Sequence, residues 1–413
     1  VAQTAVSRIQ IGLAPTNEQH KIVAKIEELF SELDQGIEYL KSAQEQLKVY
    51  RQSVLKAAFE GRLTEEWREA HADQLETANQ LLEGIQQERE NRYQQQLNEW
   101  EEAVSDWEDS GKEGRKPSKP EELENLSPAE EELIEMAVLP FQWSWAKLAS
   151  ISVVVTDGDH QAPPKENSGV SFIVISNIKN NRISFESTMY VSQAYYNALP
   201  EKRKPIAGDV LYTVTGSFGI PCLVDSNKEF CFQRHIALIR LERLIHPKFI
   251  FYFLQSRIAF QQAANAATGT AQKTVSLTSL RRFCVPVAPF DEQTQIIGEV
   301  ERKFSVIEQL DSIVQSELEK SIILRQSILK KAFSGQLVPQ DSGDENAAVL
   351  LERIREIRRH QEEDQASVPR PKKQAVMKKD LSIIEVLQEL NGLATAQDVW
   401  RRSQHQEDIE GFY

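Results

Sequence analysis

The chain has 413 residues, 40% of them hydrophobic, and carries a formal net charge of −14. This length allows two or three domains with separate cores. No run of roughly 18 apolar residues occurs, so no membrane span is expected, and Val1–Ile11 does not read as a secretory signal. The three cysteines (Cys222, Cys231 and Cys284) are too widely spaced for the common zinc sites, and they favour a reducing cytoplasm.

One long segment occurs twice, as Ala14–Leu63 and as Ala288–Leu337. The copies align without a gap, and about two positions in five are identical. Their separation far exceeds the roughly 20–50 residues of solenoid repeats. We therefore expect a duplicated helical scaffold, with the function in the different domain between the copies.

Each copy predicts a long helix, Glu18–Phe59 in the first and Glu292–Phe333 in the second. Apolar or small residues alternate at steps of four and three, which is a heptad pattern. Gly61 and Gly335 follow, where a left-handed helix cap is expected. At 1.5 Å per residue each helix is about 60 Å long. We predict that the two helices pack on each other, because each would cover the apolar stripe of the other.

The segment Thr64–Glu135 is acidic and predicted to be helical, apart from a polar linker at Asp109–Pro128. Its motif Leu81–Ile85 recurs at Leu350–Ile354, so the duplication extends beyond the long helices. A basic tail and a final segment, Leu381–Tyr413, end the chain. The final segment is compatible with a helix–turn–helix module or with a plain helical hairpin.

Between the copies, Pro140–Pro289 predicts an α+β domain, because short β-type runs alternate with turn residues. The expected strands are Ile151–Val155, Ser171–Ile175, Arg182–Phe185, Asp209–Thr215, Ile220–Val224, Phe230–Phe232 and His235–Leu241, and the expected helices are His246–Gln262 and Ser276–Arg282.

Charge is unevenly distributed. Between Pro140 and Phe290 there are 16 Lys and Arg residues against nine Asp and Glu, a local net charge of +7 in an acidic chain. A basic domain on an acidic frame is the pattern of a nucleic-acid-binding module. Chance variation in surface charge is the alternative.

Motifs for catalysis are absent from the sequence. There is no Gly-x-x-x-x-Gly-Lys-Ser/Thr phosphate loop and no Gly-x-Gly-x-x-Gly motif. The cluster Asp157, Asp159 and His160 could hold a metal ion, but an Asp-Gly turn with a hydrogen-bonding histidine is a common structural device. We favour a binding protein over an enzyme.

The chain resembles the specificity (S) subunits of type I restriction–modification enzymes. The helix ends Arg51–Leu63 and Arg325–Leu337 and the helix starts Pro15–Gln19 and Pro289–Gln293 match conserved regions of that family. Leu139–Trp145 resembles the start of a target-recognition domain, Thr268–Ser276 its end, and Gly208–Leu211 and Gly216–Gly219 internal motifs.

The resemblance implies an α+β fold, in which long antiparallel coiled-coil helices carry one β-rich target-recognition domain. The family pattern is recognition domain, helix, recognition domain, helix, and this chain is expected to lack most of the first recognition domain. The expected parts are a remnant of that domain (1–13), the first conserved helix (14–63), a helical spacer and linker (64–138), the target-recognition domain (139–287), the second conserved helix (288–338) and a C-terminal helical extension (339–413).

The resemblance also implies a non-catalytic, cytoplasmic subunit that reads half of a bipartite site in double-stranded DNA. Its helices would set the spacing and dock methyltransferase (M) subunits, and a motor–nuclease (R) subunit would join the complex. S-adenosylmethionine, ATP and magnesium would belong to the partner subunits, and this chain would bind no cofactor. The alternative is a coiled-coil adaptor whose β-rich domain binds protein.

The candidate DNA-binding residues are polar side chains clustered on predicted turns. Asn pairs with adenine and Arg with guanine in the major groove, and Lys meets phosphates. Each cluster could instead be a solvated turn. The candidates are Lys165, Asn177, Lys179, Asn180 and Arg182; Thr213, Thr215 and Ser217; Gln233, Arg234 and His235; and Gln272, Lys273 and Thr274.

Overall fold

The computed structural model describes residues 10–120, 127–134, 136–160, 163–270 and 272–367, together with Glu385 and Val399. The chain divides into two compact units, one formed by Val1–Leu29 with Ser327–Tyr413 and the other by Phe30–Gln326. Of the predicted first-domain remnant only residues 10–13 are described, and the helix–turn–helix-like segment lies almost entirely outside the described residues.

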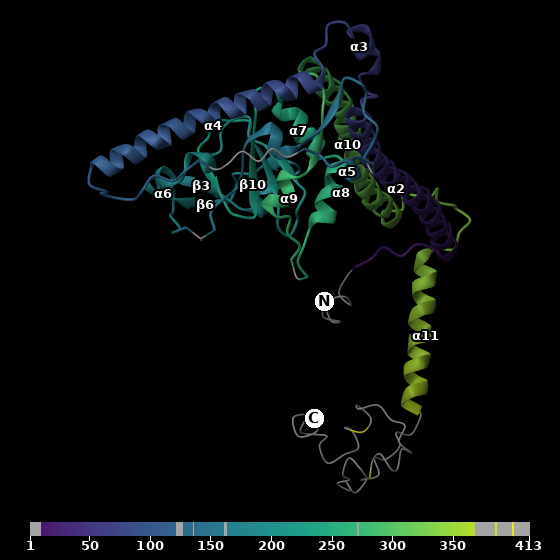
Figure 1. Cartoon of the computed structure of the whole chain (residues 1–413). Coiled ribbons are helices and arrows are strands. Elements are labelled where there is room, and N and C mark those ends of the chain that lie inside the picture. The colour runs from purple at the N-terminus through teal and green to yellow at the C-terminus, as the bar shows by residue number, and fades with distance from the viewer. Residues whose placement is uncertain are drawn as a thin grey trace. The chain divides into compact units, whose positions relative to one another are not determined.

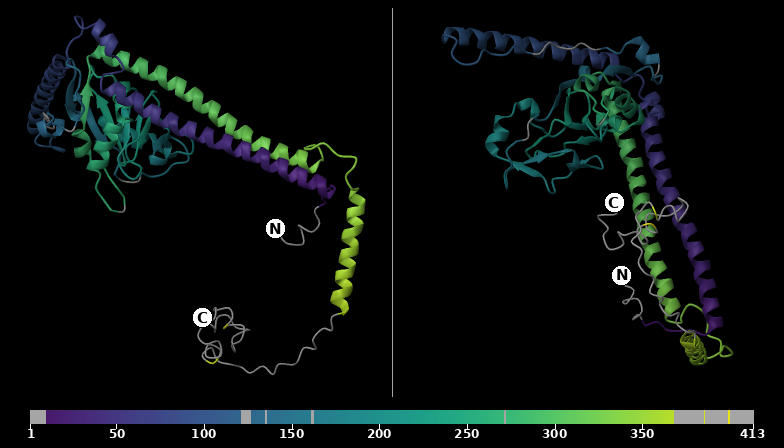
Figure 2. Two further views of the ribbon diagram at one scale, coloured as in Figure 1. Left: turned by 90° about the vertical axis from the view of Figure 1, so that its right-hand side faces the viewer. Right: turned by 90° about the horizontal axis from the view of Figure 1, so that it is seen from below.

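The two copies of the repeat form the long helices α2 (Thr16–Phe59) and α10 (Phe290–Phe333), each of 44 residues. Both end at the predicted phenylalanine. Gly61 and Gly335 then adopt φ angles of 73° and 71°, which confirms the predicted left-handed caps. Figure 2 shows α2 in purple beside α10 in green.

The helices pair antiparallel within the unit Phe30–Gln326. Gln44, late in α2, donates to Asp311, early in α10, over 3.2 Å. Arg325, late in α10, reaches back to Asp34 over 2.8 Å and lies 4.5 Å from the centre of the Phe30 ring. The predicted antiparallel coiled coil is therefore confirmed.

Residues 139–287, which we call the globular domain, contain four small sheets. The main sheet has the strand order β2-β10-β7-β8 and a second sheet has the order β6-β3-β9, while β1 pairs with β11 and β4 with β5. The strands are β1 (Ser144–Lys147), β2 (Ser152–Asp157), β3 (Val170–Ile173), β4 (Ile178–Lys179), β5 (Arg182–Ile183), β6 (Met189–Val191), β7 (Val210–Thr213), β8 (Pro221–Leu223), β9 (Phe230–Phe232), β10 (Ile236–Leu241) and β11 (Cys284–Val287).

Helices complete the globular domain and confirm its α+β class. They are α6 (Gln193–Ala198), α7 (Pro247–Leu254), α8 (Arg257–Ala266) and α9 (Leu277–Arg281), with 3-10 turns at Leu148–Ile151, Ile175–Asn177 and Glu201–Arg203. The single helix expected at His246–Gln262 was wrong. The hydroxyl of Ser256 accepts a hydrogen bond from the Ala259 amide, so it caps a new helix and separates α7 from α8.

Aromatic packing attaches the globular domain to the end of α2. Phe59, the last residue of α2, is fully buried and meets the rings of Phe249 and Phe253 on α7 edge-on, at centroid distances of 5.2 and 5.4 Å. Offset and edge-on ring pairs add to the stabilisation from area burial. The end of the coiled coil is therefore part of the domain core.

A buried ionic cluster joins the domain to the start of α10. The carboxylate of Glu292 accepts hydrogen bonds from Thr64 (2.7 Å), from the indole of Trp143 (2.8 Å) and from Arg68 (3.1 Å). Burial is the main effect on this carboxyl and raises its pKa. Two other segments of the chain thus converge on Glu292, a position that is identical in both copies of the repeat.

Between α2 and the globular domain lie α3 (Glu65–Ala70), α4 (Ala78–Asp109) and α5 (Glu130–Ile134), and α11 (Ala347–Ser367) follows α10. Figure 1 shows α4 running along one side of the globular domain. Leu81 and Ile85 of α4 are buried there, and Arg89 donates to the Ser150 carbonyl over 2.9 Å.

The three cysteines are free, buried thiols. Burial raises the pKa of Cys222 and of Cys231 to about 12, so both stay protonated at neutral pH. Among the helices that the structure describes, none combines the length and apolar character needed to cross a bilayer.

Candidate nucleic-acid interface

Several loops of the globular domain meet at one end of the main sheet. Ala237, near the start of β10, pairs with Asp157 at the end of β2 and with Tyr212 near the end of β7. Tyr212 in turn pairs with Pro221, the first residue of β8. The loops that leave β2, join β7 to β8 and precede β10 must therefore emerge together.

The segment Thr268–Val275 joins the same end of the sheet. The Val275 amide donates to Val214 (2.8 Å) and the Gly216 amide donates to Lys273 (2.9 Å), so the segment pairs with the chain that leaves β7. Thr268 and Thr274 exchange two backbone hydrogen bonds of 3.0 and 2.8 Å. The sequence motif before α10 is thus a short ribbon beside the sheet.

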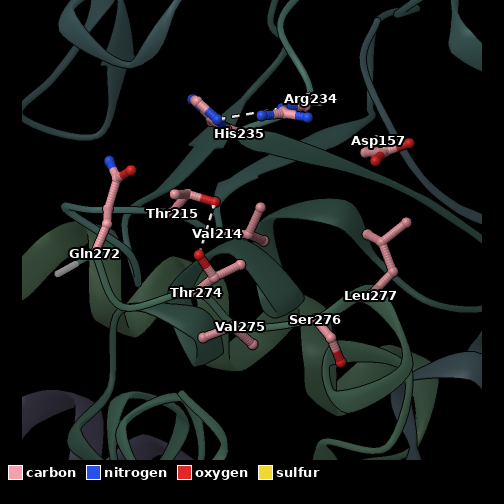
Figure 3. Close-up of a pocket in the computed structure, with 10 residues that line it drawn as sticks. All are labelled: Asp157, Val214, Thr215, Arg234, His235, Gln272, Thr274, Val275, Ser276 and Leu277. Carbon is pink, nitrogen blue, oxygen red and sulfur yellow. Dashed lines mark hydrogen bonds between the residues drawn. The ribbon is translucent and has the colours of Figure 1, made fainter. Parts of the chain in front are cut away.

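These loops enclose a cavity of about 350 Å³, which we call the sheet-end cavity. Figure 3 shows Gln272 on one side, Arg234 and His235 above and Thr215 and Thr274 between them. The lining residues are Asp157, Val214, Thr215, Arg234, His235, Gln272, Thr274, Val275, Ser276 and Leu277.

The polar side chains of this cavity are weakly tied to one another. Thr274 donates to the Thr215 hydroxyl over 3.4 Å, and the Arg234 guanidinium donates to the His235 ring, also over 3.4 Å. Both bonds are long for their types. Arg234 and Gln272 are exposed. These side chains can therefore be recruited by a ligand at little cost in internal bonding.

The electrostatics of the cavity favour an anion or a base edge. Burial, with a smaller effect of Arg234, lowers the pKa of His235, so its imidazole is neutral at pH 7 and Arg234 supplies the charge. The carboxylate of Asp157 is engaged by His160 at 2.8 Å and by Arg203 at 3.4 Å. His160 and Arg203 do not line the cavity, and their contacts with Asp157 reduce the effect of its negative charge there.

A second cavity of about 360 Å³ shares Arg234 with the first. Lys165 and Gln233 also line it, beside the Tyr190 side chain. Asp159 on its wall accepts a hydrogen bond from the Tyr195 hydroxyl, and burial together with this bond raises the pKa of Tyr195. Arg234 can therefore contact a ligand in either cavity.

The structure brings together seven of the predicted site residues and separates others. Thr215, Arg234, His235, Gln272 and Thr274 line the sheet-end cavity, and Lys165 and Gln233 line the second one with Arg234. Lys273 is exposed on the ribbon beside Gln272. Ser217 is exposed on the β7–β8 turn, where its carbonyl accepts from Thr213.

Two predicted site residues serve the fold instead of facing solvent. The Asn177 side chain is buried and accepts from the Val174 amide over 3.1 Å. Thr213 is fully buried, donates to Ser217 (2.7 Å) and accepts from Ile220 (3.0 Å). Both side chains are used within the domain, so we leave them out of the proposed contact set.

Lys179, Asn180 and Arg182 are exposed on the β4–β5 hairpin and line neither cavity. The hairpin turn has positive φ angles at Asn180 and Asn181, as a type I′ turn requires. Asn181 donates to the Pro221 carbonyl over 3.0 Å, which ties the tip to the start of β8.

Sequence reasoning missed Asp157 and Ser276 as cavity residues. Asp157 was considered only as a metal ligand, but among the described residues no group of three or more His, Cys, Asp and Glu side chains is arranged to hold a metal. Ser276 caps α9 by accepting from the Ser279 amide over 3.0 Å. The helix start at Ser276 was predicted from the sequence, but its place in the cavity was not.

Comparison with known proteins shows which proteins the chain resembles. Residues 157–320 match the type I restriction modification DNA specificity domain. The chain is 26% identical over 358 residues to the type I restriction enzyme EcoBI specificity subunit of Escherichia coli, covering 84% of this chain and 64% of that subunit. It is 31% identical over 134 residues to the StySPI specificity subunit of Salmonella potsdam, covering 30% of this chain and 29% of the relative.

A solved structure shares the fold. A chain from work described as the structural basis of complex assembly and conformational transition of the type I R-M system aligns with a TM-score of 0.53 at 18% identity, covering 82% of this chain and 64% of that one. The present chain thus spans slightly less than two thirds of the EcoBI subunit and of this structural relative. Residues 157–320 thus match the DNA specificity domain of type I restriction–modification systems, and the chain is similar to specificity subunits of these systems over most of its length.

Proposed function

We propose that this chain is a DNA-specificity subunit whose globular domain reads one half of a bipartite duplex site. The observation that carries the proposal is the sheet-end cavity, where polar side chains from four separate loops converge on a domain of net charge +7. Basic surfaces attract the phosphate backbone, and polar side chains discriminate base edges.

The side chains of the cavity suit major-groove recognition. The Arg234 guanidinium can donate two hydrogen bonds to a guanine, and the Gln272 amide can both donate to and accept from an adenine. His235, being neutral, can donate from one ring nitrogen and accept at the other. Lys165, Lys273 and the exposed hairpin residues supply further contacts to phosphates or bases.

The coiled coil would then fix the spacing of the recognised sequence. Each helix of 44 residues is about 66 Å long, which corresponds to on the order of 19 base pairs of B-form DNA at 3.4 Å each. Methyltransferase subunits would dock on the helices, and a motor–nuclease subunit would join through the complex. These partners would carry out catalysis and would bind S-adenosylmethionine, ATP and magnesium.

Salt-dependent binding of the purified chain to a 24-base-pair duplex of randomised sequence tests the DNA-binding part of this proposal. If about five Lys and Arg residues meet phosphates, the slope of log K against log salt should be near −4 to −5. An adaptor with a protein-binding domain would instead capture methyltransferase subunits while showing no DNA binding at low salt.

A further inference from the structure

Two phenylalanine rings stack on each other at the turn that joins β7 to β8. Phe218, on this turn, faces Phe260 of α8, with ring centroids 5.9 Å apart and an angle of 8° between the ring planes. Phe218 is half-buried and Phe260 is 50% exposed, and neither lines the sheet-end cavity. Phe218 belongs to the sequence motif Gly216–Gly219, for which the proposed function gives no role so far.

The helix that carries Phe260 is firmly attached to the domain. Ala259 and Ala263 of α8 are fully buried in the core. The side-chain amide of Gln262 donates to the Cys284 carbonyl over 2.9 Å and accepts from the Cys284 amide over 2.7 Å. Since Cys284 is the first residue of β11, the position of the Phe260 ring is set by the core.

The β7–β8 turn packs against this ring. Gly219 has a φ angle of 92°, and an added Cβ there would lie 3.0 Å from the Phe260 ring. Glycine therefore allows the ring to approach the backbone of the turn. Thr213 closes the turn from within, because its hydroxyl donates to the Ser217 carbonyl over 2.7 Å. Hydrogen bonding thus sets the shape of the turn, and Phe260 holds its outer end.

The other end of the turn supports Gln272. The Gly216 amide donates to the Lys273 carbonyl over 2.9 Å. A Cβ added at Gly216 would lie 3.1 Å from the Gln272 amide nitrogen, so the Gln272 side chain lies against this glycine. Figure 3 shows Gln272 at one side of the sheet-end cavity. A continuous series of contacts therefore leads from Phe260 through the turn to Gln272.

We propose that Phe260 is a positioning residue for DNA sequence recognition. Its ring fixes the β7–β8 turn, and the turn holds Gln272 where its side-chain amide can bind a base edge. The inference rests on the proposed function, in which Gln272 binds adenine. Both hydrogen bonds of an amide–adenine pair need good geometry, so a displaced Gln272 loses discrimination between bases. Phosphate contacts carry no sequence information and are made by other side chains, so binding to unselected DNA is kept.

Direct contact with DNA is the other use of a half-exposed aromatic ring. Two features favour the positioning role. One face of the Phe260 ring is already covered by Phe218, and its edge meets the backbone at Gly219. Phe260 also does not line the cavity in which the polar side chains converge.

The test compares sequence discrimination by the full-length chain and its variants. The parent first selects from a 24-base-pair duplex pool of randomised sequence. The probes are then the most enriched duplex and the unselected pool, and fluorescence anisotropy gives a dissociation constant for each at 0.1 M salt. The discrimination ratio is the constant for the pool divided by the constant for the enriched duplex.

The variants are Phe260→Ala, which removes the ring, and Phe260→Tyr, which keeps it. Phe218→Ala removes the other ring of the stack and leaves α8 unchanged. The matched control is Gln261→Ala, at the exposed neighbouring position of α8, which lines neither cavity. Melting temperatures show whether each variant is folded.

Phe260→Ala should lower the discrimination ratio at least about fivefold, since the loss of one good base contact costs at least that much. Its affinity for the unselected pool, and the ratios of Phe260→Tyr and the control, should stay within about twofold of the parent. A purely structural role would lower the melting temperature and leave the ratio unchanged. An unchanged ratio in folded Phe260→Ala would overturn the inference and leave the proposed function intact. If Phe260→Ala does not fold, an unchanged ratio in Phe218→Ala overturns it.

A double variant tests whether Phe260 acts through Gln272. In the Gln272→Ala chain, a further Phe260→Ala substitution should change the ratio by less than about twofold, because no amide is left to position. A further loss of about fivefold or more would overturn the inference, since Phe260 would then act on a base independently. If the parent enriches no sequence at all, the proposed function fails together with the inference, so the two failures are distinguishable.

Discussion

The guanidinium of Arg51 lies 3.8 Å from the centre of the Phe304 ring. The equivalent residues of the other repeat, Arg325 and Phe30, form the same pair at 4.5 Å. Each contact joins the late part of one helix to the early part of the other. The duplicated sequence thus makes the same cation–π contact twice, as two copies related by an approximate twofold axis must.

The two equivalent phenylalanines should differ in their contribution to stability. Phe304 is 4% exposed and also meets Tyr252 edge-on, whereas Phe30 is half-buried. We expect Phe304→Ala to lower the free energy of unfolding by about 3 kcal/mol and Phe30→Ala by about 1 kcal/mol. Urea denaturation measures both, and equal losses would contradict this assignment.

Glu292 should be far less replaceable than its counterpart Glu18. Glu292→Gln leaves Arg68 buried beside an uncharged partner, which should cost about 3 kcal/mol. Glu18 is 5% exposed, and no hydrogen bond or ion pair of its side chain occurs among the described residues. Glu18→Gln is therefore the matched control, expected within about 0.5 kcal/mol of the parent. Urea denaturation measures both losses. If Glu18→Gln lowered the free energy of unfolding as much as Glu292→Gln, the buried cluster around Glu292 would not explain the loss.

Acidification should weaken the start of α7. The His246 ring accepts a hydrogen bond from the Lys248 amide over 3.2 Å, which requires an unprotonated nitrogen. Burial, and to a smaller extent Lys248, lowers the pKa of His246 in the folded state. The unfolded state therefore binds protons first as pH falls below about 6.5, so stability present above that pH is lost below it.

His246→Asn should flatten this acid loss, since asparagine caps a helix without titrating. The measurement is the melting temperature at pH 7.5 and pH 5.5 for the parent and the variant. Burial also lowers the pKa of His235, which acts in the same direction in both proteins, so the difference between them isolates His246. A variant that loses as many degrees as the parent would refute the capping role.

Gly216→Ala should disturb the sheet-end cavity. Gly216 has a φ angle of 71°, and an added Cβ would lie 3.1 Å from the Gln272 amide nitrogen. We expect a loss of about 1 kcal/mol in stability and weaker discrimination between DNA sequences. Gly298→Ala, in the interior of α10 with no heavy atom near the added Cβ, should be neutral or slightly stabilising. Unchanged DNA discrimination in Gly216→Ala would argue against a role for Gln272.

The scaffold could be predicted from sequence because its signals are local. Heptad spacing and the glycines after Phe59 and Phe333 located both long helices and their ends. The pairing of β1 with β11 was missed. The register partners Trp145 and Pro286 are separated in the sequence by almost the whole domain, and neither segment alone indicates its partner. The break between α7 and α8 was missed, although the polar residues Gln255 and Ser256 interrupt the apolar run and Ser256 caps the second helix.

For the candidate site, residue type and turn position located the polar loops, but they could not tell inward from outward side chains. Thr213 is buried like the other three residues of β7, and the Asn177 side chain accepts a hydrogen bond within its own turn. The sequence also could not show that Arg234 lines two cavities, because this depends on how the strand order places its loop.

Selection of bound sequences from a randomised duplex pool tests the central claim most directly. The chain, with its methyltransferase partner, is compared with the Arg234→Ala, Gln272→Ala double variant and with a Lys228→Ala control. We predict an enriched motif for the parent and the control, and a motif with altered or lost bases for the double variant, while its binding to unselected DNA persists. An identical enriched motif for the parent and the double variant would contradict sequence reading by the sheet-end cavity.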